Sequence, residues 1–76
     1  MIGKPVDRAT LSEHLAQAER QVAEGVLRIA RQREVVADLE RTGLDTKEAR
    51  TLLAELQSLQ ALHVADRDRL KQELEA

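Results

Sequence analysis

The stretch Thr42-Gly43-Leu44-Asp45 separates two long helical patterns and decides the fold. Gly43 suits the left-handed position just after a helix, and Leu44 would then pack back on the last turn. Asp45 is typical of the residue that caps the start of the next helix. A connection this short makes the two helices antiparallel neighbours. The sequence therefore predicts an all-α, antiparallel two-helix hairpin with Gly43, Leu44 and Asp45 as its turn.

Before this turn, the chain carries a seven-residue repeat that is typical of a helix. A branched apolar residue opens each unit, at Leu15, Val22, Ile29 and Val36, and an alanine follows each of them, at Ala16, Ala23, Ala30 and Ala37. Seven residues are about two helical turns, so both rows run along one side of a helix. The pattern predicts a helix over about residues 7–42. Its start is open between Asp7 and Thr10, because either side chain can cap it.

After the turn, a second apolar row predicts a helix over about residues 46–75. This row includes Leu52, Leu56, Leu59 and Leu70. The six residues before the first helix form an N-terminal lead that we expect to be flexible. The whole chain, residues 1–76, is expected to form a single helical-hairpin domain.

Two helices of this length share only one seam, and several apolar residues fall beside it. They are Leu27, Val35, Leu53, Leu62 and Val64. A monomer would expose them as an elongated apolar patch, larger than soluble monomers usually tolerate. A second hairpin would cover this patch, so we expect a homodimer in the form of a four-helix bundle with coiled-coil packing; the alternative is an unidentified protein partner. The expected bundle core consists of Leu15, Val22, Ile29, Val36, Leu52, Leu56, Leu59 and Leu70.

The composition of the 76 residues narrows the function classes. There is no cysteine, which excludes a disulfide framework, and no aromatic residue, which argues against a stacking platform for single-stranded nucleic acid. The formal net charge is −2, and charged residues of both signs make up 34% of the chain. No run is long and apolar enough for a signal peptide or a membrane span. We therefore expect a cytoplasmic protein that is not bound to a membrane.

The sequence offers no pattern for enzyme chemistry. It lacks the Glu-x-x-His pair of di-iron bundles, a glycine-rich phosphate loop, and a serine or cysteine beside a base. We expect no catalytic activity, no cofactor and no metal site.

His63 falls on the apolar row of the second helix and is a candidate buried polar residue. An antiparallel pairing about the turn would place it opposite Gly25, whose small size would then make room for the imidazole ring. Asp66 and Arg67, three and four residues later, could hydrogen-bond the ring. The favoured reading is a polar residue that fixes helix register. The alternative is a bundle tuned by pH or by a ligand at His63, because histidine titrates near neutral pH.

Arg28, Arg31 and Arg33 form the nearest approach to a basic patch. A small dimeric hairpin can bind RNA through one face of its bundle, so a small RNA- or DNA-associated regulator is an alternative function. However, acidic residues flank the three arginines and weaken the local field. A solvated, salt-bridging face is therefore favoured over nucleic-acid binding.

Residues 30–41 (ARQREVVADLER) and 63–70 (HVADRDRL), with the turn Gly43-Leu44-Asp45-Thr46, resemble a group of short bacterial hypothetical proteins. That group shares the repeat, a Gly-x-Asp-Thr turn and a His-x-x-x-Arg-x-x-Leu ending, and the resemblance covers nearly the whole chain. It implies a bacterial source and no particular activity. We therefore expect a non-catalytic structural or protein-interaction module that acts as a homodimeric helical bundle.

Overall fold

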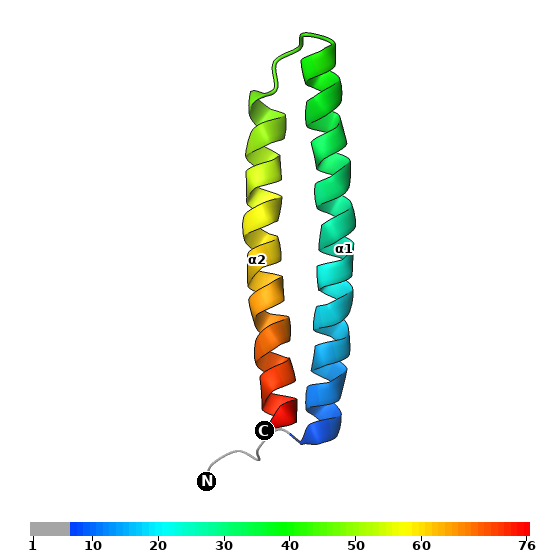
Figure 1. Cartoon of the computed structure of the whole chain (residues 1–76), viewed down its shortest axis with the longest axis vertical. Coiled ribbons are helices and arrows are strands. Elements are labelled where there is room, and N and C mark those ends of the chain that lie inside the picture. Colours follow the sequence, from blue (N-terminus) through cyan, green and yellow to red (C-terminus); the bar gives the residue numbers. More distant parts are fainter. Residues whose placement is uncertain (1–6) are drawn as a thin grey trace.

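The computed structural model describes residues 7–76, which form two antiparallel helices joined by a short turn (Figure 1). Helix α1 spans Arg8–Arg41 and helix α2 spans Lys47–Glu75. The 34 residues of α1 make it about 51 Å long. The predicted all-α hairpin is confirmed, with helix bounds within a residue or two of those expected. The expected flexible lead, residues 1–6, lies outside the described residues.

Asp7 caps the start of α1, which resolves the choice between Asp7 and Thr10. The Asp7 carboxylate accepts a hydrogen bond from the backbone N–H of Thr10 at 2.8 Å. This satisfies one of the N–H groups that a helix start leaves unpaired. The backbone hydrogen bond from Thr10, followed by that from the Thr10 side chain, lowers the pKa of Asp7 below its ordinary value. The ionised carboxylate is therefore the form that stabilises this helix end.

The end of α1 has the hydrogen bonds of a Schellman motif, as the sequence predicts. Gly43 has a φ of 74°, its N–H donates to the Glu40 carbonyl at 3.1 Å, and the Leu44 N–H donates to the Leu39 carbonyl at 2.9 Å. A left-handed residue is needed here, which explains the glycine. Leu44 is 61% exposed, so hydrogen bonds contribute more to this turn than the expected apolar contact.

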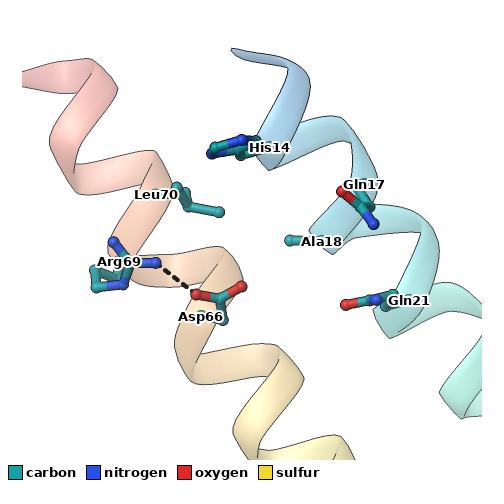
Figure 2. Close-up of a pocket in the computed structure, with 7 residues that line it drawn as sticks. All are labelled: His14, Gln17, Ala18, Gln21, Asp66, Arg69 and Leu70. Atoms are coloured by element: carbon teal, nitrogen blue, oxygen red, sulfur yellow. Dashed lines mark hydrogen bonds and ion pairs between the residues drawn. The ribbon is translucent and has the colours of Figure 1, made fainter. Parts of the chain in front are cut away.

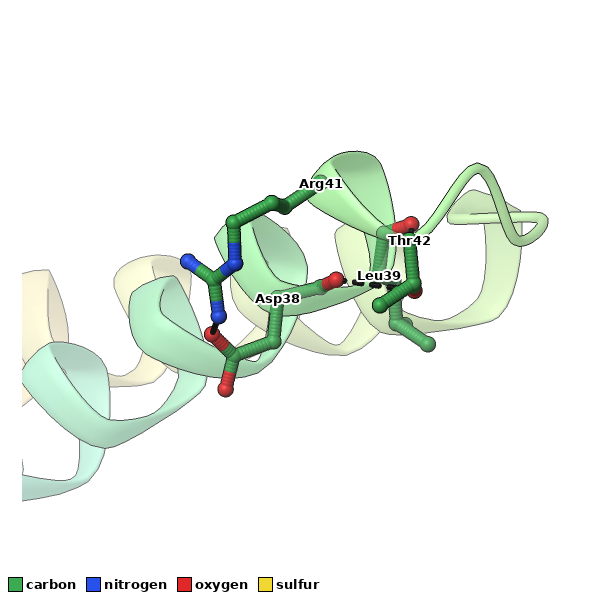
Figure 3. Close-up of polar contacts among 4 residues, drawn as sticks. All are labelled: Asp38, Leu39, Arg41 and Thr42. Atoms are coloured by element: carbon green, nitrogen blue, oxygen red, sulfur yellow. Dashed lines mark hydrogen bonds and ion pairs between the residues drawn. The ribbon is translucent and has the colours of Figure 1, made fainter.

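Polar contacts reinforce the last turn of α1 (Figure 3). The Thr42 hydroxyl donates to the carbonyls of Asp38 at 2.9 Å and Leu39 at 3.2 Å. Arg41 forms an ion pair with the Asp38 carboxylate. The threonine hydroxyl therefore adds a second hydrogen bond to carbonyls that already accept one from the backbone N–H groups of Thr42 and Leu44.

Helix α2 begins one residue later than the sequence predicts. Thr46 occupies the capping position and makes no side-chain capping bond, whereas the Asp45 carboxylate accepts a hydrogen bond from the Lys47 N–H at 3.0 Å. Asp45, which precedes the cap residue, thus accepts a hydrogen bond from one of the N–H groups that the first turn of α2 leaves unpaired. Arg50 then donates to the Thr46 hydroxyl at 2.9 Å and forms an ion pair with Glu40 of α1, which ties both helices to the turn.

Residues that face the opposite helix recur at alternating spacings of three and four along both helices. In α1 they are Leu11, Leu15, Ala18, Val22, Gly25, Ile29, Gln32, Val36 and Leu39. In α2, with its cap, they are Thr46, Ala49, Leu53, Leu56, Gln60, His63, Arg67, Leu70 and Leu74. This is the spacing of an antiparallel coiled coil. We call these two rows the seam. Within residues 7–76, only Ala18, Val36 and Leu70 are buried, with 3% to 6% of their surface exposed.

Two of the expected core leucines lie outside the seam. Leu52 and Leu59 are 45% and 44% exposed in the hairpin. Each precedes a seam residue by one position, and one residue turns a helix by about 100°. The apolar row of α2 is therefore rotated away from α1, and the hairpin alone does not bury it. The alanine row of α1 (Ala16, Ala23, Ala30 and Ala37) is likewise exposed. The other expected core residues are in the seam, and Leu53, which was expected to lie beside the seam, is also part of it.

Candidate functional site

The middle of the seam is polar and is built around Gln60 and Gly25. The Gln60 side-chain amide donates a hydrogen bond to the Val22 carbonyl of α1 at 2.8 Å. Its Oε1 atom is buried without a hydrogen-bond partner. A Cβ atom added at Gly25 would lie 1.8 Å from that oxygen. Gly25 is therefore small because the Gln60 side chain lies over it.

The prediction that Gly25 makes room for His63 is wrong. Gln60, one seam position earlier, occupies that space. His63 is half-buried in the seam and forms no hydrogen bond with Asp66 or Arg67. Asp66 is exposed rather than buried, and it pairs with Arg69 at 2.6 Å. The helices are thus shifted by about one seam layer relative to the expected pairing.

A second glutamine repeats the same contact nearer the turn. The Gln32 side-chain amide donates to the Ala49 carbonyl of α2 at 2.9 Å. One glutamine from each helix therefore reaches across to the backbone of the other, and these bonds fix the relative height of the two helices. Sequence reasoning missed both residues. Each glutamine belongs to a second seven-residue row of its helix, and its polarity concealed that it faces the opposite helix. The rows are Leu11, Ala18, Gly25, Gln32 and Leu39 in α1, and Thr46, Leu53, Gln60, Arg67 and Leu74 in α2.

Gly25 and Gln60 are expected to be energetically coupled. In the wild-type chain, Gly25→Ala gains about 1 kcal/mol of helix propensity but displaces the Gln60 amide, whose hydrogen bond is worth about 1 kcal/mol. The net change should be close to zero. In a Gln60→Ala background the displacement cost is absent, so Gly25→Ala should stabilise by about 1 kcal/mol. Urea unfolding of the four proteins at one concentration measures this coupling; equal effects of Gly25→Ala in both backgrounds would contradict it.

The open end of the hairpin carries a polar pocket between the helices (Figure 2). Its lining comprises His14, Gln17, Ala18 and Gln21 of α1 and Asp66, Arg69 and Leu70 of α2. Arg69 pairs with Asp66 at 2.6 Å and with Glu73 at 2.8 Å. The hydrogen bonds to Asp66 and then Glu73 raise the pKa of Arg69 above its ordinary value. The charges in this pocket are therefore compensated within α2.

Leu52 and Leu59 lie on the same side of the hairpin as this pocket. Seam residues follow one another at steps of three and four, and the residues just before those that end a four-residue step form one row in each helix. In an antiparallel pair, these two rows flank the same side of the seam. In α1 they are His14, Gln21, Arg28 and Val35; in α2 they are Leu52, Leu59, Asp66 and Glu73. Leu62, three residues after Leu59, adjoins them. We call the apolar part of this side, Val35, Leu52, Leu59 and Leu62, the leucine face. Its residues are 40% to 67% exposed.

The opposite side of α1 carries the alanine row. Val26 is 57% exposed and adjoins Ala23 and Ala30 at helical spacings of three and four. We call Val26 and the four alanines the alanine face. It contains no leucine, so the largest exposed apolar side chains flanking the seam belong to the leucine face.

The three arginines proposed for nucleic-acid contact do not form one patch. Arg28 and Arg31 line a groove beside the leucine face, and Arg28 pairs with Glu24 at 3.6 Å. Arg33 lies two residues after Arg31, and that spacing turns it about 160° away around the helix. The structure therefore separates Arg33 from the other two.

No helix within residues 7–76 combines the length and apolarity needed to cross a membrane. The same residues contain no cluster of three or more histidine, aspartate or glutamate side chains arranged to hold a metal ion. No protein-family model matches the sequence, and no curated protein or solved structure shows significant similarity to it. The resemblance to short bacterial proteins, and the bacterial source it implies, therefore stay predictions.

Proposed function

We propose that this chain is a non-catalytic structural or protein-interaction module that acts as a homodimeric four-helix bundle. The observation that carries the proposal is the imbalance between buried and exposed apolar residues. Within residues 7–76, three residues are buried, whereas seven large apolar residues are at least 40% exposed: Val26, Leu27, Val35, Leu44, Leu52, Leu59 and Leu62. Burying apolar area is the main favourable term in folding, so this hairpin lacks most of the stabilisation it could have.

Small domains overcome this shortage with disulfides, metals or oligomerisation. The chain has no cysteine. Association with a second hairpin buries exposed leucines without any additional component, and symmetric dimers are the commonest protein oligomers. This favours self-association as the source of the missing core.

The charged groups support a structural role rather than a catalytic one. Asp7 caps the start of α1, and Arg69 pairs with Asp66 and Glu73, so these charged side chains have partners that stabilise the helices. The hydrogen bonds of Gln32 and Gln60 likewise serve to hold the two helices in register.

Sedimentation equilibrium at micromolar concentration and neutral pH tests the proposal. The expected mass is twice that of one chain, and thermal unfolding should shift to higher temperature as the concentration rises. A folded monomer whose unfolding is independent of concentration would contradict the proposal. It would also mean that another molecule covers the leucine face.

A further inference from the structure

The leucine face changes character along the hairpin. Because the helices are antiparallel, residues at equal height have numbers that add up to about 85, as Gly25 and Gln60 do. Val35 and Leu52 therefore lie at nearly the same height, close to the turn. Toward the open end, the same side of the hairpin carries the polar pocket with His14 and Asp66. On this side, the exposed apolar residues thus lie near the turn and in the middle of the hairpin, whereas the residues near the open end are polar.

The two edges of this side, one from each helix, also carry different charged residues. The α1 edge carries the basic residues Arg28 and Arg31, with Glu24 pairing with Arg28. The α2 edge carries Glu55 at nearly the height of Arg31, between Leu52 and Leu59. Neither Arg31 nor Glu55 forms an ion pair within residues 7–76, where the described pairs involve other residues. Arg31 and Glu55 therefore remain available for pairing at matching height.

We propose that the leucine face is the dimer interface and that two copies pack there with their turns at the same end. This inference rests on the proposed function and names the surface and the orientation of its dimer. The two-fold axis runs parallel to the helices, so α1 of each copy packs against α2 of the other. All neighbouring helices in the bundle are then antiparallel.

The apolar distribution selects this orientation. A two-fold axis along the helices preserves height, so Val35 of one copy meets Leu52 of the second copy, and the two polar ends meet each other. With the turns at opposite ends, α2 would pack on α2. Leu52 would then face Asp66 of the second copy if the whole faces overlapped. Shifting the copies to bring the leucines together would leave much of each face uncovered.

The opposite charges of Arg31 and Glu55 favour the same orientation; Asp38 and Glu48, which meet at the same spacing, are like-charged, and Asp38 is already paired with Arg41. Packing α1 on α2 brings Arg31 of one copy to the height of Glu55 of the second copy, on both sides of the two-fold axis. Packing α1 on α1 with the leucines together would instead bring Arg28 near Arg31 of the second copy, and like charges repel. The apolar pattern and the charge pattern, which are independent, therefore favour one arrangement.

The absence of native cysteine allows a direct test by disulfide capture. Single-cysteine chains are mixed in pairs, one of them isotope-labelled, oxidised in air and analysed by mass spectrometry. Val35→Cys mixed with Leu52→Cys reports the proposed contact. Leu52→Cys mixed with Leu59→Cys reports turns at opposite ends, because these two positions differ by about 10 Å in height when the turns coincide. Val26→Cys mixed with Gln57→Cys is the matched pair on the opposite side of the seam.

Sedimentation of each reduced variant comes first and separates the proposed function from this inference. If the reduced variants and the wild type all sediment as monomers, the proposed function itself fails. If they are dimers, the mixed Val35–Leu52 disulfide should be the main covalent product. A predominant product from either of the other two pairs, or no mixed disulfide from any pair, would overturn the inference while leaving the dimer intact.

A charge exchange gives a second readout that does not depend on cysteine. Arg31→Glu and Glu55→Arg should each raise the dissociation constant of the dimer by about tenfold, because each reversal acts at both symmetric contacts. The double variant should recover most of the wild-type affinity. If the two substitutions instead raise the dissociation constant additively in the double variant, Arg31 and Glu55 do not face each other across the interface.

Discussion

Replacing Leu52 and Leu59 together with glutamate is expected to dissociate the dimer into hairpin monomers. Both leucines are about half exposed in the hairpin, at 45% and 44%, and burying the remaining half of a leucine is worth about 1 kcal/mol. Four such side chains meet in the dimer, so their loss weakens association by about 4 kcal/mol, or about 10³-fold. Glutamate keeps the helix propensity of leucine, so α2 itself should persist.

Sedimentation equilibrium over a range of concentrations measures this change. The control is Val26→Glu, which places a glutamate on the alanine face at a site that is 57% exposed. The proposed interface leaves Val26 in water, so this variant should stay dimeric. Dissociation by Val26→Glu, with Leu52→Glu/Leu59→Glu still dimeric, would assign the interface to the opposite side.

The ends of the helices could be predicted from sequence because they depend on neighbouring residues. The glycine with positive φ at 43 and the aspartate cap at 7 follow rules that involve three or four residues around each helix end. Even there, the choice between Asp7 and Thr10 needed the structure, since both residues satisfy the same rule. Local chemistry therefore specified the hairpin and its turn almost completely.

The seam could not be predicted from apolarity alone. Gln32, Gln60, His63 and Arg67 all face the opposite helix, while Leu52 and Leu59 do not. Gln60 can occupy the seam because its amide reaches the Val22 carbonyl, a residue 38 positions away in the chain. A bond of that kind depends on the relative height of two helices, which no local pattern contains. The expected contact between Gly25 and His63 failed for the same reason.

The rotation of α2 has a physical reason if the chain dimerises as proposed. In a four-helix bundle, the apolar side of each helix faces the bundle centre rather than its hairpin partner. Leu56 in the seam and Leu52 and Leu59 in the leucine face together form one stripe, which extends from the side of α2 that faces α1 to the side that forms the leucine face. A lone hairpin exposes part of this stripe, whereas a bundle buries all of it. The polar seam and the apolar face are then two parts of one core.

Leu70→Ala is expected to cause the largest loss of stability within the hairpin itself. Leu70 is only 3% exposed and lies at the open end of the hairpin, beside Ala18 and His14 (Figure 2). Truncating a buried leucine costs about 2–5 kcal/mol, because the transfer energy is lost and a cavity is left. No turn tethers this end, so the helices are held together there by the packing of Leu70 with the half-buried Leu11, Leu15 and Leu74 of the seam. For a domain of this size, the loss should lower the melting temperature by at least about 10 °C.

Leu27→Ala is the matched control, because the chemical change is identical and Leu27 is 70% exposed. Its effect should stay within about 0.5 kcal/mol. Both variants and the wild type must be unfolded at one protein concentration, since dimerisation makes the midpoint depend on it. If Leu70→Ala lowers the stability while the folded protein keeps the mass of a dimer, then Leu70 acts by holding α1 against α2 at the open end. Similar effects of the two substitutions would mean that the open end is not packed as the structure has it, and that the leucine face contributes nearly all of the stability.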